Sequence, residues 1–317
     1  MNLTRDRLPG TDRGEEPPMA SKRRRASFHP HLSTRDFRVL ARFIHGRFGI
    51  KVPDVKKGMI EARLCKRLSR LDMGSYAQYC DYLFSPEGME KELSHFIDEV
   101  TTNKTDFFRE ANHFTCLVDE VLPAIMGSRR VGAGHKLKVW SCACSRGDEP
   151  YTLAMVLSEF ARSNPGFDFS ILATDISTRV LEVARRGVYD ASEIAPVPLA
   201  LRKKYLLKSK DPRRHQVRIV PGLRKKVMFR QLNLMDSEYR LDRAMDIIFC
   251  RNVTIYFDTE TTQQLMLRLC DRLAPGGHLF MGHSEFLDCK MLPLVPVAPT
   301  VYKKVRTHEK EGTGSGC

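Results

Sequence analysis

The chain has 317 residues, 42% of them hydrophobic, and a formal net charge of +14; this length allows two domains, each with a buried core. Its nine cysteines are odd in number and scattered, which argues against a disulfide framework and a zinc site. Because no apolar run approaches the roughly 18 residues of a membrane span and no signal-like start is present, we expect a soluble cytoplasmic protein.

Residues 1–28 combine glycine, proline and charge with almost no apolar pattern, including a basic run from Lys22 to Arg25. This composition predicts a disordered basic tail. A solvated tail and a tail that contacts nucleic acid or a membrane surface both fit this composition. Residues 306–317 are predicted to form a flexible C-terminal tail.

Residues 29–110 are predicted to form a small helical domain, because apolar residues recur at helical spacing from Ser33 onward. The clearest helix covers about residues 57–71, with isoleucine and leucine on one side. Four cations occupy another side: Arg63, Lys66, Arg67 and Arg70. They could meet an acidic partner helix or form an ordinary solvated face.

Residues 111–305 alternate strand and helix patterns, which predicts a mainly parallel sheet covered on both faces. The expected strands are 136–141, 169–174, 227–231, 245–250 and 278–282. The expected helices are near 149–162, 177–186 and 259–273. The run from Pro275 to Gly277 predicts a turn before the last strand, and prolines after residue 292 predict a terminal hairpin at a sheet edge.

The alternation breaks at about residues 200–230, where residues 201–230 hold twelve Lys or Arg against one Asp. Residues 217–220 and 226–229 resemble short strands joined through Pro221 and Gly222. We therefore expect a small, strongly basic β-subdomain inserted in the sheet domain.

Residues 139–151 read as a strand, a turn of small residues and a helix start, and the next strand ends at Asp175. Such a turn lets a ligand approach the backbone, and a carboxylate at the next strand tip can accept both hydroxyls of a ribose. The turn lacks the Gly-x-Gly-x-x-Gly dinucleotide fingerprint. It therefore favours a one-nucleoside cofactor such as S-adenosylmethionine.

Polar residues gather in three further segments: 101–110, 231–236 and 247–257. The last two follow predicted strands, as Asp175 does, and ligands of open parallel sheets bind beyond the carboxyl ends of the strands. With these segments the chain resembles the CheR family, the chemoreceptor glutamate O-methyltransferases, over about residues 31–303. The matching motifs are, in order, 103–110, 140–151, Asp175, Asn233 with Leu234, 250–257 and 282–285.

The resemblance implies a helical domain followed by a Rossmann-like methyltransferase domain, with a β-subdomain that docks receptors in some members. It implies methyl transfer from S-adenosylmethionine, which becomes S-adenosylhomocysteine, to glutamates on the cytoplasmic helices of a chemoreceptor, and it implies no metal. The cofactor-binding residues that it implies are Asn103, Thr105, Arg109, Glu149, Asp175, Asn233, Leu234, Arg251 and Asn252.

The resemblance also implies Arg109 and Tyr256 as the residues that position the reacting groups. A glutamate carboxylate is already ionised near neutral pH, so the reaction needs orientation and exclusion of water rather than a general base. We interpret Arg109 as an orienting cation, for the substrate or equally for the cofactor, and Tyr256 as a hydrogen-bond donor or an aromatic wall. The family usually has Thr and Glu where Arg146 and Asp148 stand, and a cation at Arg146 would oppose the sulfonium unless it points to solvent.

Two other classes of function compete with this one. A nucleic-acid methyltransferase would use the basic stretch 201–230 and the basic tail. Against it, the strand end carries Arg251 and Asn252 rather than the Asp/Asn-Pro-Pro-Tyr/Phe motif of many amino-group methyltransferases, so nucleic acid is an unlikely partner. The other class is a non-catalytic module that binds cofactor or receptor, in which Arg146 and Asp148 mark a decayed site.

Overall fold

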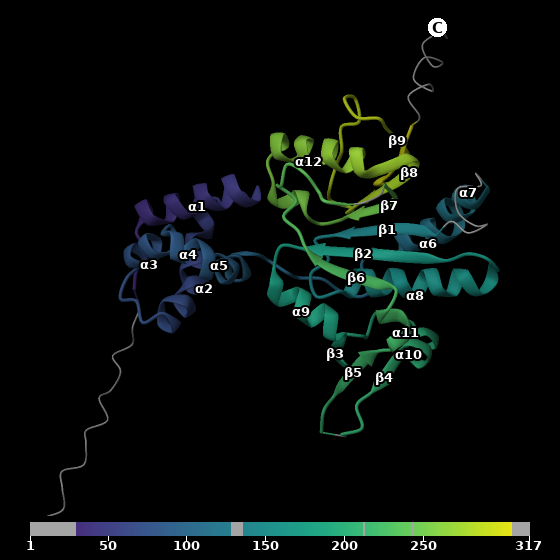
Figure 1. The fold of residues 1–317 in the computed structure, drawn as a ribbon, viewed down its shortest axis with the longest axis horizontal. Helices are drawn as coiled ribbons and strands as arrows, with labels where there is room; N and C mark the ends of the chain where they lie inside the picture. The colour runs from purple at the N-terminus through teal and green to yellow at the C-terminus, as the bar shows by residue number, and fades with distance from the viewer. Residues whose placement is uncertain (1–29, 128–135, 212, 242–243, 306–317) are drawn as a thin grey trace, which may run out of the picture.

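The computed structural model describes residues 30–127, 136–211, 213–241 and 244–305. A helical N-terminal part is joined to a larger α/β part (Figure 1). The tails predicted at 1–28 and 306–317 lie outside the described residues. Within the described ranges, no helix combines the length and the apolar character that crossing a membrane requires.

The N-terminal part is helical, as predicted, because its apolar residues recur at helical spacing between suitable caps. Its elements are α1 (Thr34–Phe48), η1 (Asp54–Lys56), α2 (Lys57–Arg70), α3 (Tyr76–Leu83), α4 (Pro86–Lys91) and α5 (Leu93–Val100). Ser33 accepts a hydrogen bond from Asp36 N at the start of α1, which ends at Gly49 with φ 71°. A β-carbon at Gly49 would lie 2.6 Å from Met235 Sδ, so glycine permits this close approach of the α/β part.

The cationic side predicted for α2 is only partly free. Arg67 is 6% exposed and donates hydrogen bonds to Glu92 from Nε (2.7 Å) and Nη2 (2.5 Å). Arg63 donates to the backbone carbonyls at the end of α5. The prediction that Arg67 lies on a free basic face is therefore wrong, because its charge is buried and paired inside the helical part. Lys66 and Arg70 are exposed.

The α/β part is built on a sheet with strand order β6-β2-β1-β7-β8-β10-β9. The first five run parallel, as predicted, and β10 and β9 form an antiparallel edge hairpin, also as predicted. The strands are β1 (Leu137–Cys142), β2 (Phe169–Asp175), β6 (Val227–Gln231), β7 (Met245–Cys250), β8 (Leu273–Met281), β9 (Leu294–Ala298) and β10 (Val301–Lys304).

The strand order reverses between β1 and β7. From β1 the chain adds β2 and then β6 on one side, and it returns to place β7 and β8 on the other side. In open sheets of this kind, ligands bind at such a switch point, beyond the carboxyl ends of the two strands. Residues 143–147 and 251–253, which follow β1 and β7, are therefore the expected floor of a binding site.

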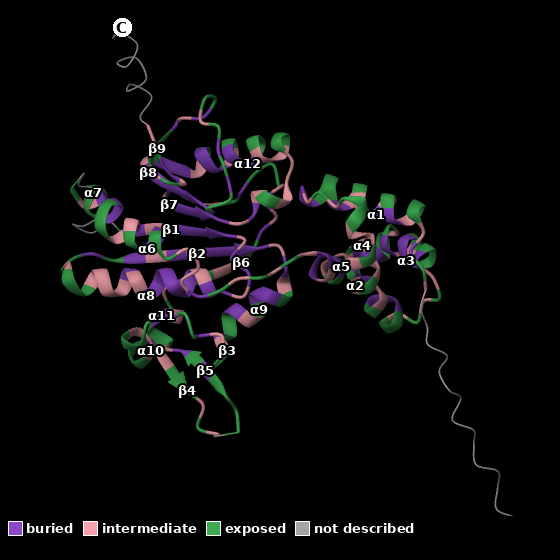
Figure 2. Cartoon of the chain, turned by 180° about the vertical axis from the view of Figure 1, so that it is seen from behind, coloured by how far each residue is buried: buried purple, intermediate pink, exposed green. Residues whose placement is uncertain are grey.

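Helices cover both faces of the sheet (Figure 2). They are α6 (Asn112–Cys116), η2 (Leu117–Val121), α7 (Leu122–Gly127), α8 (Asp148–Ser163), α9 (Thr178–Arg186), η3 (Thr254–Tyr256) and α12 (Thr259–Arg272). Neighbouring residues of one strand enter opposite cores: Val139 packs in the core that contains α8, and Trp140 in the core that contains α12. Both faces are buried, as parallel sheets require.

One predicted turn at the end of this part is wrong. Strand β8 begins at Leu273, so Pro275 to Gly277 lie within the strand, where its register against β7 shifts. Gly276 has φ 72° there. The glycines therefore form a bulge in a strand rather than a connection before it.

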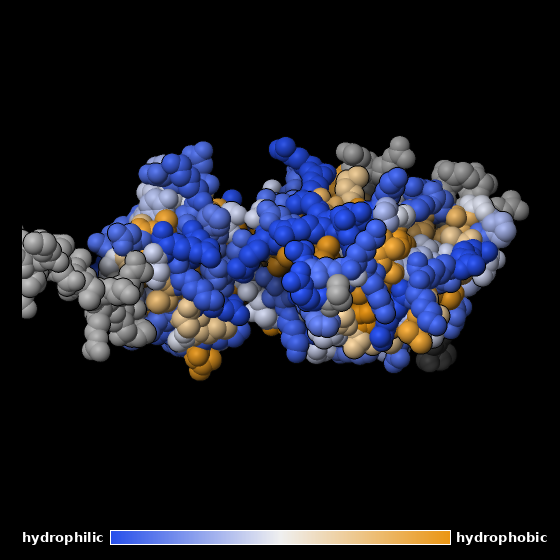
Figure 3. All heavy atoms as spheres, turned by 90° about the horizontal axis from the view of Figure 1, so that it is seen from below, coloured by the Kyte–Doolittle hydropathy of each residue, from blue (hydrophilic) through white to orange (hydrophobic). Residues whose placement is uncertain are grey.

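The three-stranded antiparallel sheet β3-β5-β4, with α10 packed beside it, is called the β-subdomain below. Its elements are β3 (Val188–Asp190), α10 (Leu199–Tyr205), β4 (Leu206–Lys208) and β5 (Gln216–Ile219). The predicted hairpin through Pro221 is wrong, because Pro221 begins α11 (Pro221–Arg224) and the next strand, β6, pairs with β2 of the large sheet. The face that carries the β-subdomain is hydrophilic over much of its area, with hydrophobic patches between the polar residues (Figure 3).

Candidate functional site

A cavity of about 280 Å³ lies beyond the carboxyl ends of β1 and β7. All ten residues predicted for the site line this one cavity: Asn103, Thr105, Arg109, Glu149, Asp175, Asn233, Leu234, Arg251, Asn252 and Tyr256. They come from segments that are far apart in the sequence, and the strand order brings them together. What each residue binds remains a prediction.

The turn after β1 is held by Asp175 at the end of β2. Asp175 accepts hydrogen bonds from the backbone N of Ser145 (2.8 Å) and of Ser177 (2.9 Å). Burial raises the pKa of Asp175 to about 6 although these hydrogen bonds oppose the shift. Ala143 and Ser145 have φ 50° and 49°, so the turn adopts a conformation that non-glycine residues rarely take.

Glu149 and Arg251 form the charged floor of the cavity. Ser141 Oγ donates to Glu149 Oε1 at 2.7 Å, and Arg251 Nε lies 3.6 Å from Glu149 Oε2. Burial raises the pKa of Glu149, and Arg251 opposes the shift. Arg251 is 6% exposed, and its Nε and Nη1 have no hydrogen-bond partner among the described residues. These N–H groups of the buried Arg251 guanidinium therefore still lack an acceptor.

Residues 103–106 and Arg109 form another wall of the cavity, and their segment connects to the strand tips. Ser145 Oγ donates to the carbonyl of Asn103 (2.9 Å), and Arg251 Nη2 donates to the carbonyl of Arg109 (2.5 Å). The side chain of Arg109 makes one long hydrogen bond, from Nη1 to the carbonyl of Lys104 at 3.3 Å. Its guanidinium is therefore only weakly held and lies at the cavity.

The loop after β7 is organised by Glu285, which belongs to the matching motif 282–285 but was not predicted as a site residue. The Glu285 carboxylate accepts backbone hydrogen bonds from Asn252, Val253, Thr254 and Gly282 at 2.6–2.7 Å. A β-carbon at Gly282 would lie 2.6 Å from Asn252 Nδ2 and 2.7 Å from Glu285 Oε2. Glu285 therefore fixes Asn252, whose φ is 58°, at the cavity.

Asn233 and Leu234 hold the loop after β6 in place. Asn233 Nδ2 donates to the carbonyl of Arg47 in the helical part (2.9 Å), and Leu234 is 7% exposed in the core beside α12. The amide of Asn233 thus joins the two parts of the chain as well as lining the cavity.

The helical part supplies a wall of the cavity that sequence analysis missed. Its residues there are Phe48, Ile50, Lys51, Val52, Lys56, Met59 and Ile60. Lys51 N donates to the carbonyl of Tyr256 (2.8 Å), and Lys56 Nζ lies 5.8 Å from the centre of the Tyr256 ring. The sequence pattern does not identify residues 50–52 as site residues, because they only connect two helices.

Arg146 and Asp148 do not line the cavity. Arg146 Nη1 pairs with Glu193 at 2.6 Å, and its guanidinium lies 5.8 Å from the centre of the Tyr189 ring, on the β-subdomain side of the turn. Asp148 is 1% exposed, and burial raises its pKa to about 6. The cation at Arg146 is therefore directed away from the cavity.

Comparison with known proteins identifies the class and then the family. A family model described as CheR methyltransferase, SAM binding domain, matches residues 103–299, and one described as CheR methyltransferase, all-alpha domain, matches residues 35–101. The chain is thus an S-adenosylmethionine-dependent methyltransferase with a Rossmann-like fold. It belongs to the CheR methyltransferase family.

Relatives share most of this chain. The chemotaxis protein methyltransferase of Borreliella burgdorferi is 37% identical and covers 84% of this chain and 92% of its own length. Chemotaxis protein methyltransferase 2 of Pseudomonas aeruginosa is 38% identical, with 86% and 94% covered. The chemotaxis protein methyltransferase of Escherichia coli is 39% identical, with 80% and 85% covered.

Proposed function

We propose that the chain transfers methyl groups from S-adenosylmethionine to glutamate side chains on the cytoplasmic helices of a chemoreceptor, in the cytoplasm. The observation that carries this proposal is the cavity, which gathers the buried Asp175, the partly buried Glu149, Arg109 and Tyr256 at the switch point of the sheet. The relatives are named chemotaxis protein methyltransferases, which supports a receptor as the substrate. In domain terms, we propose residues 29–110 for the helical domain and 111–305 for the methyltransferase domain.

The residues of the cavity fit this cofactor. S-adenosylmethionine supplies a methyl group on a cationic sulfur, and carboxylates suit its ammonium group and its ribose hydroxyls. We assign these to Glu149 and Asp175, with Asn103 and Thr105 beside them. The free donors of Arg251 suit a carboxylate. Asn233, Leu234 and Asn252 complete the adenosine side of the pocket.

The reaction requires orientation more than proton transfer. An ionised glutamate carboxylate is already a nucleophile at neutral pH, so no residue has to remove a proton. Arg109, whose guanidinium is weakly held, orients the carboxylate or the cofactor, and Tyr256 donates a hydrogen bond or forms the wall. The helical part excludes water by closing one side of the cavity.

Two basic surfaces suit an acidic receptor. One is the pair Lys66 and Arg70 on α2, both exposed. The other is the set of exposed cations on the β-subdomain: Lys203, Lys204, Lys208, Lys210, Arg213, Arg214 and Arg218. We propose that the first surface meets the methylated helix and that the second docks the receptor at another point.

Labelled cofactor tests the proposal. The full chain is incubated with S-adenosylmethionine carrying a labelled methyl group and with either receptor cytoplasmic fragments or nucleic acid. Base-labile label on the receptor supports the proposal, since a methyl ester hydrolyses in base. Label on nucleic acid, or cofactor binding with no transfer to a receptor, contradicts it.

Variants then separate the assigned roles. Tyr256→Phe should lower kcat while the Kd for S-adenosylhomocysteine stays near that of the wild type, and Asp175→Asn should raise that Kd. Replacing both Lys66 and Arg70 by alanine should raise KM for the receptor fragment alone. Lys303→Ala is the matched control, because Lys303 is exposed on β10, outside the cavity.

A further inference from the structure

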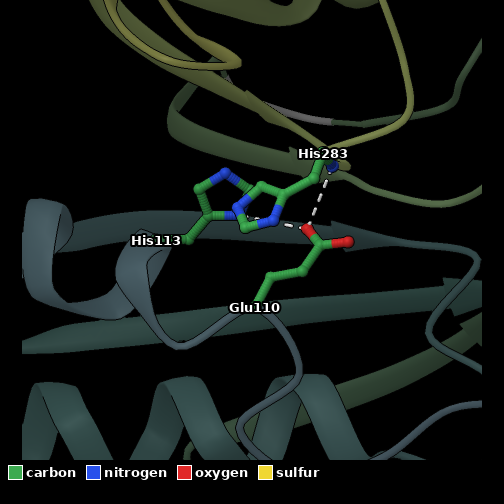
Figure 4. A group of neighbouring side chains, drawn as sticks. All are labelled: Glu110, His113 and His283. Carbon is green, nitrogen blue, oxygen red and sulfur yellow. Dashed lines mark hydrogen bonds and ion pairs between the residues drawn. The ribbon is translucent and has the colours of Figure 1, made fainter.

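Three side chains of types that can bind a metal ion meet beside the proposed cofactor pocket: Glu110, His113 and His283 (Figure 4). Glu110 precedes α6, His113 lies in α6, and His283 follows β8. One ligand atom from each lies within 4.8 Å of the others. His113 Nδ1 is 3.5 Å from Glu110 Oε2, and the two imidazole rings are 4.7 Å apart between centroids.

One of these atoms is buried without a hydrogen bond. His113 is 2% exposed, and among the described residues its Nδ1 has no hydrogen-bond partner. Its other nitrogen, Nε2, lies 2.8 Å from Thr300 Oγ1. In the neutral ring with the proton on Nε2, that nitrogen donates to Thr300 and Nδ1 presents a lone pair toward Glu110. Metal-ligating histidines are held in this way by a partner on the second nitrogen.

We propose that Glu110, His113 and His283 bind a divalent transition-metal ion, with Zn²⁺ as the expected ion. Two imidazoles and one carboxylate with a fourth position open to water form a donor set typical of zinc. Mg²⁺ and Ca²⁺ prefer oxygen ligands, so they are expected to bind more weakly. The sequence gives no such signal, because the spacing from His113 to His283 follows no known metal motif.

Tetrahedral ligation fits with a small adjustment. Bonds of about 2.0–2.1 Å place ligand atoms about 3.4 Å apart, close to the 3.5 Å between His113 Nδ1 and Glu110 Oε2. The remaining ligand, His283, is exposed and free to rotate toward the other two. Its exposure also gives the ion a path from solvent.

Metal binding at this site competes with the cofactor pocket. Glu110 Oε2 lies 3.3 Å from Arg251 Nη2, and the same guanidinium donates to the carbonyl of Arg109. A cation on Oε2 weakens this ion pair and repels Arg251, which lines the pocket. We therefore expect zinc to reduce the affinity for S-adenosylhomocysteine.

The test uses the full chain after removal of metals by chelation. Zn²⁺ affinity is measured by calorimetry for the wild type, His283→Ala and His45→Ala, and Co²⁺ binding is followed by visible absorption. His283→Ala removes only the imidazole, since the backbone N of residue 283 still donates to Glu110. His45→Ala is the matched control, because His45 is also exposed and lies 2.7 Å from a carboxylate, Asp258.

We expect one zinc ion per chain in the wild type and in His45→Ala with equal Kd, and a Kd at least about tenfold higher in His283→Ala. An equal Kd for Zn²⁺ in the wild type and His283→Ala would overturn the site. The near-ultraviolet band of a Co²⁺–thiolate bond would also overturn it, because the proposed ligands include no cysteine. Zinc should also raise the Kd for S-adenosylhomocysteine in the wild type and not in His283→Ala. The same effect in both proteins would overturn the competition with Arg251.

Discussion

The pair of Arg67 and Glu92 offers a direct test of how the helical domain is stabilised. Their side chains are 7% and 2% exposed, and they share two hydrogen bonds of 2.7 and 2.5 Å. Tyr79 Oη donates to Glu92 Oε1 at 2.9 Å. In Arg67→Ala, the Glu92 carboxylate stays buried with the tyrosine as its remaining side-chain donor. Breaking such a pair costs about 3–5 kcal/mol of unfolding free energy.

The measurement is urea unfolding followed by circular dichroism, since urea does not screen an ion pair as guanidinium does. Lys66→Ala on the exposed side of the same helix is the control, with an expected change within about 0.5 kcal/mol. Replacing Arg67 by Met together with Glu92 by Leu should recover part of the loss, because an apolar pair leaves no buried charge but leaves the Tyr79 hydroxyl without its acceptor. If Arg67→Ala unfolds like Lys66→Ala, the ion pair contributes nothing and Arg67 is available to a partner.

Three further predictions concern Gly49, where the two parts of the chain meet, Asp148 at the start of α8, and Glu285, which holds the loop after β7. Gly49→Ala should destabilise the chain by about 1–2 kcal/mol in urea, since φ is 71° and Met235 Sδ is 2.6 Å from the added carbon; no loss would mean that Met235 moves freely. Burial raises the pKa of Asp148 to about 6 in the folded chain, so the unfolded chain loses this proton first and the free energy of unfolding falls as pH rises from about 4 to 6. Asp148→Asn should therefore raise the unfolding temperature relative to wild type above pH 6 and not below pH 4. A constant difference across pH would contradict this. Glu285→Gln should raise the Kd for S-adenosylhomocysteine in calorimetry about tenfold, because its amide cannot accept all four backbone hydrogens; an unchanged Kd would show that Asn252 is held otherwise.

The sheet and the edge at which the predicted site residues gather could be predicted because both depend on local pattern. Strands β1, β2 and β7 are apolar runs that end in small or polar residues, and the ends of parallel strands meet at one edge. Asp175 and Arg251 could therefore be placed together without knowing the loops between them.

Other features depend on tertiary contacts that local patterns do not encode. The expected strand 227–231 is confirmed as β6 of the large sheet by its pairing with β2, but the basic hairpin also expected through Pro221 does not form, because Pro221 begins α11. The wall from Ile50 to Val52 is fixed by docking of the helical part on Tyr256. Arg67 was predictable in principle: it stands three residues after Leu64 and one before Leu68, within the buried stripe of α2.

Arg146 stands where the family usually has Thr, but its contacts do not indicate a decayed cofactor site. A decayed site would direct the cation at the position of the sulfonium, and it would leave the new charge unpaired. Instead, Arg146 pairs with Glu193, and the hydroxyl of Tyr189 donates to its carbonyl at 2.7 Å. Gly147, with φ 94°, leaves little room for a β-carbon beside Tyr189, because that carbon would lie 3.0 Å from the Tyr189 hydroxyl. The turn is therefore packed on the β-subdomain through Arg146 and Gly147, while its other side, at Ser145, holds Asp175 at the pocket.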